Sequence, residues 1–193
     1  MRILVSRERR LHIMRGLPGT GKSTMVKEYL NAMIGKEISL PVICSADFYF
    51  TEKKEKRDPP VVLNRITSWF HVNEVPYNFR PNLLTAAHSQ CQCDALNAMA
   101  KGLADVIVDN TNCSFAEYAI YIQIARVFDY DIHIIELHDG NVSEEELEYY
   151  FERCTHGVPM QQMHNMLNRW DYLPTEIMCA DDVHMRTEFR VVE

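Results

Sequence analysis

The sequence lacks a long apolar run, a signal-peptide pattern and a cysteine framework, and each absence removes a class of protein. No segment is apolar over the ~20 residues that a membrane-spanning helix needs, so we expect no membrane insertion. Residues 1–7 carry charges without an apolar stretch before them, which favours an intracellular protein. Cys91 and Cys93 have the wrong spacing for a zinc site, and the six cysteines include no second such pair, so we expect reduced thiols rather than a disulfide framework.

Repeats, low-complexity segments and an excess of basic charge are also missing. A chain of 193 residues suits one α/β domain better than two, so we expect residues 1–193 to form a single domain. The net charge of −7 gives the surface as a whole no attraction for a polyanion. Any anion-binding site must therefore be built locally.

Glycine is scarce, yet three of the 7 glycines lie between residues 16 and 21, in the segment G-L-P-G-T-G-K-S. This segment fits G-x-x-x-x-G-K-[ST], the phosphate-binding P-loop. Its glycines let the backbone wrap closely around an anion, and the helix that follows adds its positive N-terminal dipole. Lys22 supplies charge to the β- and γ-phosphates, and Ser23 offers a hydroxyl to Mg²⁺. We therefore predict that ATP or another NTP binds, with Mg²⁺, to Gly16, Pro18, Gly19, Thr20, Gly21, Lys22, Ser23 and Thr24.

Strand and helix patterns alternate along the rest of the chain. Short apolar runs predict buried strands at 11–14, 41–44, 105–109 and 131–137, with an edge strand at 185–192. Helices are expected between them: from the P-loop to Gly35, over 82–101, from Ser114, from Ser143 to about Arg153, and from Pro159 to about Trp170. Ser114 with Glu117, and Ser143 with Glu146, have the spacing of capping boxes. The alternation predicts a parallel sheet with helices on both faces.

Two aspartates follow predicted strands, where ligands bind in such sheets. Asp109 ends an apolar strand in the Walker-B pattern, which favours a role in holding Mg²⁺ over a turn or N-cap role. Asp47 follows the strand at 41–44 and is either a general base for an acceptor hydroxyl or a turn residue.

Arg153 stands just before the segment H-G-V-P. An arginine that closes over the transferring group assists phosphoryl transfer, and a segment with glycine and proline can serve as a lid. Spacing alone favours the simpler interpretation, in which Arg153 lies at a helix C-terminus. We place the predicted helical lid at residues 143–170.

The combination of motifs resembles the polynucleotide 5′-hydroxyl kinases, a group of P-loop kinases found in nucleic-acid end-healing enzymes, and the related kinase-like domains of animal ubiquitin-ligase-binding proteins. The matching stretches are Arg15–Thr24, Ser45–Phe50, Tyr77–Phe79 leading into Ala87-His88, Val106–Asn112 and Arg153–Pro159. The P-loop is shared by many families, whereas the D-N-T-N and H-G-V segments are more selective.

The resemblance implies a P-loop kinase fold and roles for several residues. It implies that Asp47 is the general base, that Thr111 and Asn112 help to hold the acceptor strand, and that Arg153 is a lid arginine. Phage-type members have an arginine three residues after the base, where this chain has Phe50. The family offers no match for the insertion at about 51–76, which we expect near the acceptor site.

Together these features predict an ATP- and Mg²⁺-dependent kinase that phosphorylates the 5′-hydroxyl of RNA or DNA. Lys22, Asp47 and Arg153 are the predicted catalytic residues, and Ser23 and Asp109 the predicted Mg²⁺ ligands. One alternative is a kinase for a nucleoside or another small alcohol, which the negative net charge favours. The other is a non-catalytic nucleotide-binding module, which would not need a base such as Asp47.

Overall fold

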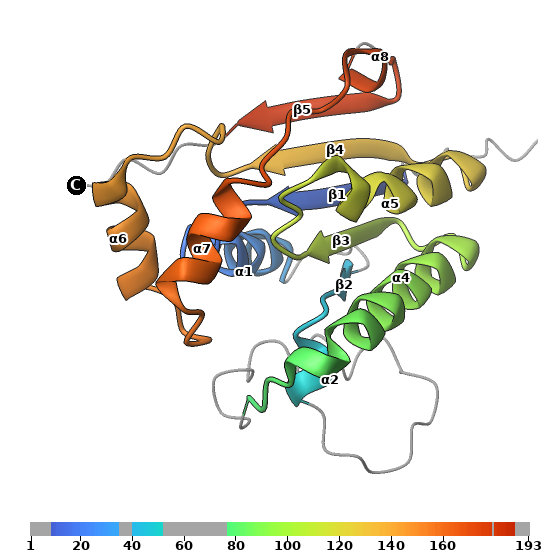
Figure 1. Ribbon diagram of the computed structural model, residues 1–193. Helices are drawn as coiled ribbons and strands as arrows, with labels where there is room; N and C mark the ends of the chain where they lie inside the picture. The colour runs from blue at the N-terminus through green and yellow to red at the C-terminus, as the bar shows by residue number, and fades with distance from the viewer. Residues whose placement is uncertain (1–8, 35–39, 52–76, 179, 188–193) are drawn as a thin grey trace, which may run out of the picture.

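A computed structural model describes residues 9–34, 40–51, 77–178 and 180–187. Within them, five strands form one sheet in the order β2-β3-β1-β4-β5, and every pairing is parallel. The strands are β1 (Arg10–Arg15), β2 (Val42–Cys44), β3 (Asp105–Asp109), β4 (Asp131–Glu136) and β5 (Val183–Thr187). Because all strands run the same way, their carboxyl ends meet at one edge of the sheet (Figure 1).

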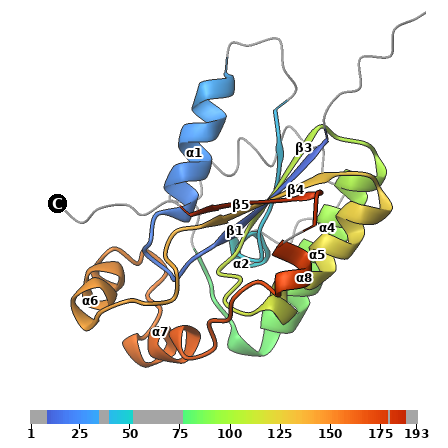
Figure 2. The same ribbon diagram turned by 90° about the horizontal axis from the view of Figure 1, so that it is seen from above.

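Helices cover both faces of this sheet. Helix α1 (Lys22–Met33) lies on one face, and α4 (Leu84–Ala100), α5 (Phe115–Val127) and α8 (Thr175–Met178) lie on the other (Figures 1 and 2). Helices α6 (Glu144–Glu152) and α7 (Met160–Leu167) lie beyond the carboxyl ends of the strands. Short helices α2 (Phe48–Thr51) and η2 (Pro81–Leu83) come before and after residues 52–76 in the chain, and the predicted insertion at about 51–76 lies outside the described residues apart from Thr51. The predicted layered α/β fold is confirmed.

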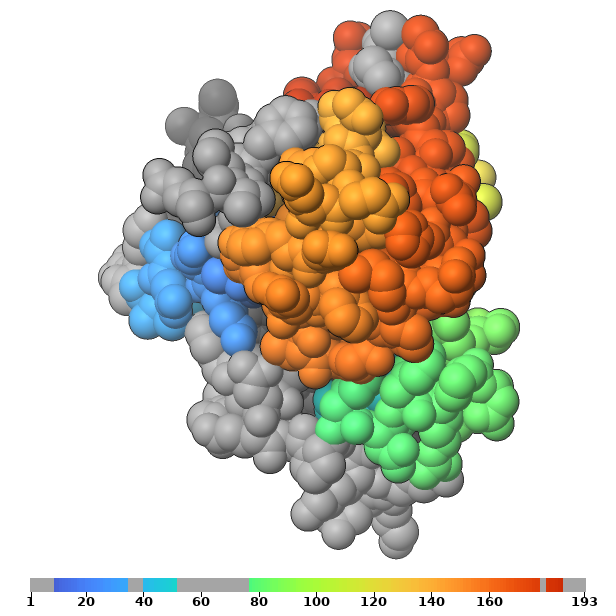
Figure 3. Space-filling view, turned by 60° about the vertical axis from the view of Figure 1, so that its left-hand side comes forward, coloured from blue at the N-terminus to red at the C-terminus, as the bar shows by residue number. Residues whose placement is uncertain are grey.

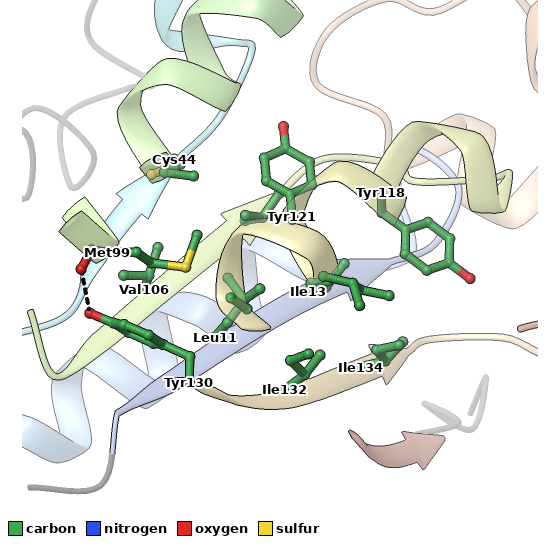
Figure 4. Close-up of a cluster of buried hydrophobic side chains, with 14 of the residues drawn as sticks. Leu11, Ile13, Cys44, Met99, Val106, Tyr118, Tyr121, Tyr130, Ile132 and Ile134 are labelled. Carbon is green, nitrogen blue, oxygen red and sulfur yellow. Dashed lines mark hydrogen bonds between the residues drawn. The ribbon is translucent and has the colours of Figure 1, made fainter. Parts of the chain in front are cut away.

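The main core lies between the sheet and helices α4 and α5. Alternate side chains of β1, Leu11 and Ile13, are fully buried there, as are Ile132 and Ile134 of β4 (Figure 4). This two-residue period is what a strand requires to place one set of side chains on one face. A smaller cluster under α1 contains the remaining apolar side chains of the central strands, so both faces are packed.

Several boundaries differ from the predicted ones. Ser143 and Glu146 form the expected capping box, but Ser114 makes no side-chain cap. Instead, the amide of Phe115 donates a hydrogen bond of 2.6 Å to the carboxylate of Asp171, far along the chain. Strand β5 begins earlier than expected, and residues 188–192 of the predicted edge strand lie outside the described residues. In the part of the chain that the structure describes, no helix has the length and apolar character to cross a bilayer.

Three histidines lie in register across the sheet, on the face that carries α1. His12, His133 and His184 are neighbours on β1, β4 and β5, and the successive ring centroids are 5.1 and 5.0 Å apart. Burial lowers the pKa of His133 to about 4, and the two flanking histidines add to this effect. His133 is therefore neutral in the native state at neutral and mildly acidic pH.

We expect this row to make the fold sensitive to acid. As the pH falls from 6.5 towards about 4, the unfolded chain protonates His133 while the native chain does not, so the free energy of unfolding decreases. The variant His133→Gln should show a shallower decrease over this range in urea-unfolding curves measured at a series of pH values. His164→Gln on α7 is the control, and an equal slope in wild type and His133→Gln would contradict the interpretation.

Candidate functional site

The P-loop connects β1 to α1, and its backbone has the form that an anion site requires. Gly19 and Gly21 adopt left-handed conformations, with φ of +81° and +96°, which favour glycine. Gly21 is the N-cap of α1, so no side chain caps the helix, and no acidic residue lies in its first turn. The N-terminal amides and the helix dipole therefore suit a phosphate group.

Lys22 is buried at the start of α1. Its ammonium group donates two hydrogen bonds of 2.8 Å, to the carbonyl oxygens of Gly16 and Leu17. Burial lowers the pKa of Lys22, and the negative charge of Asp109 opposes this shift. The lysine side chain thus contacts the P-loop backbone. The attraction of Asp109 does not fully offset the effect of burial on the pKa of Lys22.

Ser23 and Asp109 meet as the Walker-B interpretation predicts. The register of β1 and β3 pairs Met14 with Asp109, so the carboxylate lies beside the P-loop. The Ser23 hydroxyl donates a hydrogen bond of 2.9 Å to Asp109 Oδ2. Burial raises the pKa of Asp109, and the charge of Lys22 opposes this shift. A hydroxyl and a carboxylate fit Mg²⁺, which prefers oxygen ligands and often takes only one or two from the protein besides substrate phosphates.

Asp47 follows β2 at the same edge of the sheet, and its side chain is 44% exposed. Its charge acts on both Lys22 and Asp109, which places it on the P-loop side of the molecule. The Tyr77 hydroxyl donates a hydrogen bond of 2.8 Å to Asp47 Oδ1. His156 Nε2 lies 3.7 Å from Oδ2. An accessible carboxylate therefore stands beside the anion site.

The loop after β3 is tied to the P-loop through its backbone. The amide of Gly16 donates to the Thr111 carbonyl at 3.0 Å. Asn112 is buried in a left-handed conformation, and its side-chain amide donates to the Met14 carbonyl at 2.8 Å. These contacts give both residues a role in shaping the loop, while their role in holding an acceptor stays a prediction.

The side chain of Arg153 contacts Tyr149, one turn back in α6. It is the C-cap of α6, as its spacing favours. Its exposed guanidinium lies 5.0 Å from the Tyr149 ring and donates to the hydroxyl of that residue. The catalytic role of Arg153 stays a prediction.

The sequence interpretation missed the role of Arg15, the last residue of β1. Arg15 is fully buried and forms an ion pair with Glu136 at the end of β4. Its other donors reach the carbonyl oxygens of Asn112, Cys113 and Asp171, at 2.9, 3.0 and 2.7 Å. One guanidinium therefore joins the carboxyl end of β1 to the loop after β3, to β4 and to the segment after α7.

His138 was missed as well, since nothing in its local sequence marks it. It is buried after β4 and accepts a hydrogen bond of 3.1 Å from the amide of Leu17, inside the P-loop. Its ring packs on Trp170, with centroids 4.1 Å apart. Burial lowers the pKa of His138 to about 4, so the ring is neutral at neutral pH and can accept this bond.

Helix α6 packs directly against the P-loop. A Cβ atom added to Gly19 would lie 1.8 Å from the carbonyl oxygen of Tyr150, near the C-terminus of that helix. Figure 3 shows the atoms of α6 and α7 as one continuous surface that borders the N-terminal segment on one side and the start of α4 on the other. The predicted lid at 143–170 thus lies beside the P-loop.

Comparison with known proteins identifies the family. A family profile described as an AAA domain matches residues 11–153, most of the chain, and the chain therefore belongs to this family. The human YLP motif-containing protein 1 is 23% identical over 184 residues, and its mouse counterpart is 22% identical. These matches cover 90% of this chain but only 8% and 12% of the two relatives, so the chain corresponds to a small part of them.

Solved structures show that the fold is that of P-loop kinases. Kti12 from Chaetomium thermophilum, in complex with ADP-AlF3, has a TM-score of 0.52 at 13% identity, with 92% of this chain and 88% of that one covered. The APS kinase CysC from Mycobacterium tuberculosis, in complex with AMPPNP and APS, has a TM-score of 0.54 at 12% identity, with 95% and 91% covered. The predicted fold class is confirmed.

Removing Arg15 should be strongly destabilising. The variant Arg15→Met leaves the Glu136 carboxylate buried without its partner, and breaking a buried ion pair in this way typically reduces the free energy of unfolding by about 3–5 kcal/mol. Arg126→Met is the matched control, because it breaks the partly exposed pair with Asp182, where about 0–1 kcal/mol is typical. Urea unfolding measures both, and equal effects would contradict the central role of Arg15.

Adding a methyl group at Gly19 should separate α6 from the P-loop. Gly19→Ala places a Cβ against the Tyr150 carbonyl, whereas the control Gly157→Ala, also at positive φ (+62°), meets no atom within 4 Å. Both variants carry backbone strain, but only the first has the collision. We expect Gly19→Ala to raise the Kd for ATP, measured by calorimetry, by at least about tenfold relative to Gly157→Ala. A tenfold change corresponds to ~1.4 kcal/mol of binding free energy. Equal binding by the two variants would show that the close contact has no consequence.

Proposed function

We propose that this AAA-domain protein is an ATP- and Mg²⁺-dependent kinase that transfers the γ-phosphate to the 5′-hydroxyl of RNA or DNA. The observation that carries the proposal is the placement of Asp47, an accessible carboxylate beside a P-loop that already has its own buried carboxylate, Asp109. A module that only binds a nucleotide needs Asp109 and has no use for a second, accessible carboxylate at this position.

The donor half of the site supports nucleotide binding. Lys22 and the P-loop amides hold the β- and γ-phosphates, and Ser23 with Asp109 provides the oxygen ligands for Mg²⁺. When bound, Mg²⁺ neutralises charge on the phosphates of the donor. Two proteins of the same fold have been solved with nucleotide analogues, Kti12 with ADP-AlF3 and the APS kinase with AMPPNP, which supports nucleotide binding by this chain.

Asp47 supplies the chemistry of the acceptor half. As the acceptor oxygen forms its bond to the γ-phosphorus, its proton passes to the carboxylate of Asp47. The bond between that phosphorus and the bridging oxygen breaks, and ADP leaves with the electron pair. The carboxylate then releases the proton to solvent, to which its side chain is open.

Aromatic rings beside Asp47 favour an acceptor that carries bases. Phe50, Tyr77 and Phe79 form one cluster. The centroid of the Phe50 ring lies 5.9 Å from that of Tyr77 and 5.1 Å from that of Phe79. The planes of Tyr77 and Phe79 are nearly parallel, at 8°, and Phe79 is 46% exposed. An exposed ring can stack on an unpaired base, a contact typically worth about 1–3 kcal/mol. A nucleoside acceptor would use the same ring, so acceptor length decides between the two.

Transfer of labelled γ-phosphate to a panel of 5′-hydroxyl oligonucleotides, nucleosides and nucleotides tests the proposal. We expect labelled oligonucleotides, with Lys22→Ala inactive and Asp47→Asn reduced about 10²–10⁴-fold, as is typical when a general base is lost. ATP binding should persist in Asp47→Asn, because the substitution is nearly isosteric and lies outside the P-loop. Asp131→Asn, at the opposite edge of the sheet, is the control.

Two results of this assay would replace the proposal. Labelling of nucleosides alone would identify a small-molecule kinase. ATP binding without any transfer in wild type, or transfer that Asp47→Asn leaves unchanged, would remove the general base on which the assignment rests.

A further inference from the structure

We propose that Tyr77 and His156 are positioning residues that hold the Asp47 carboxylate from two sides, so that Oδ2 is the oxygen that receives the acceptor's proton. This inference rests on the proposed function and adds to it the residues that orient the base. It also joins the lid to the base, because His156 belongs to the segment between α6 and α7.

Tyr77 fixes one oxygen of the carboxylate. Its hydroxyl donates to Oδ1 at 2.8 Å, and burial together with the charge of Asp47 raises the pKa of Tyr77 well above its usual value. Tyr77 therefore keeps its proton and remains a donor throughout the working pH range. Its ring is held in turn by edge contact with Phe50, so the donor itself has a fixed position. With Oδ1 engaged, Oδ2 is left for the acceptor hydroxyl.

His156 approaches the other oxygen. Its Nε2 lies 3.7 Å from Oδ2, and its ring lies on that of Tyr77 with centroids 4.4 Å apart. This distance from Nε2 to Oδ2 is longer than a hydrogen bond. An acceptor hydroxyl can therefore bind to Oδ2 without displacing a hydrogen bond from His156. The His156 side chain is 30% exposed, and the backbone turns at Gly157 immediately after it, with φ of +62°. Among the described residues, the His156 side chain therefore connects the lid to the acceptor half of the site.

The arrangement couples base orientation to lid position. Asp47, Tyr77 and His156 come from three segments that are far apart in the chain, and a half-exposed aspartate on its own can rotate among several rotamers. Contacts on both sides select the orientation in which Oδ2 is accessible. Orientation of a catalytic group in advance removes an entropic part of the barrier.

A double-mutant cycle tests whether Tyr77 acts through Asp47. Tyr77→Phe keeps the ring and removes the donor. We expect kcat for transfer to fall about 10–100-fold, the range for a hydrogen bond to a charged group, with the KM for ATP unchanged. In the Asp47→Asn background the same substitution should have little further effect. The matched control is Tyr172→Phe, at a residue that is 69% exposed.

The same cycle with His156→Asn tests the lid contact, and His164→Asn on α7 is its control. Hydrogen exchange of residues 153–158 provides a readout that needs no activity, and we expect faster exchange in Tyr77→Phe and His156→Asn than in either control. If wild type transfers phosphate but Tyr77→Phe is unaffected, or its effect adds fully to that of Asp47→Asn, the inference is wrong. If wild type transfers nothing, the proposed function fails, and unchanged exchange in Tyr77→Phe would then also overturn the contact.

Discussion

The buried guanidinium of Arg15 is the contact on which the geometry of the site depends. It pairs with Glu136 and donates to the carbonyl oxygens of Asn112, Cys113 and Asp171, so three strand ends and the segment after α7 meet at one side chain. Burying an arginine is costly unless its donors have partners, and here each branch of the fork has one. The planar fork also requires its acceptors in fixed directions. The positions of the P-loop and of the loop after β3 relative to each other follow from this requirement.

The proposed donor and acceptor halves of the site are built in different ways. Lys22, at the start of α1, and Asp109, at the end of β3, are buried side chains positioned by the P-loop backbone and by the strand register. Asp47 is half-exposed and is contacted by Tyr77 and His156, which lie on separate segments outside the sheet. The donor half is therefore an extension of the core, whereas the acceptor half depends on contacts between surface segments. Such a division lets one fold serve many acceptors, because acceptor contacts can change without disturbing the core.

This division also explains what the sequence could reveal. The P-loop, the alternating strands and the Ser143 capping box depend on neighbours in the chain, and the structure has them as predicted. Ser114 shows the opposite case: its local pattern was present, but Asp171 caps that helix from a distant segment. Arg15 and Tyr77 were noted only as parts of matching stretches, because Arg15 lies 97 residues from its partner Asn112 and Tyr77 lies 30 residues from its partner Asp47. No local pattern records a contact across such separations.

Lys22 and Asp109, the charged residues of the proposed donor half, depend on surrounding contacts for their positions. Burial shifts the pKa of Lys22 downward and that of Asp109 upward, so each group is driven towards its neutral form and is stabilised mainly by the other. The attraction between these two charges does not outweigh the cost of burying them, because both pKa values shift in the direction that burial causes. The surrounding contacts, Arg15 with Glu136 and His138 with the P-loop amide, must therefore maintain the geometry. Residues remote from the chemistry are thus needed to keep two poorly compensated charges where a phosphate and a cation can use them.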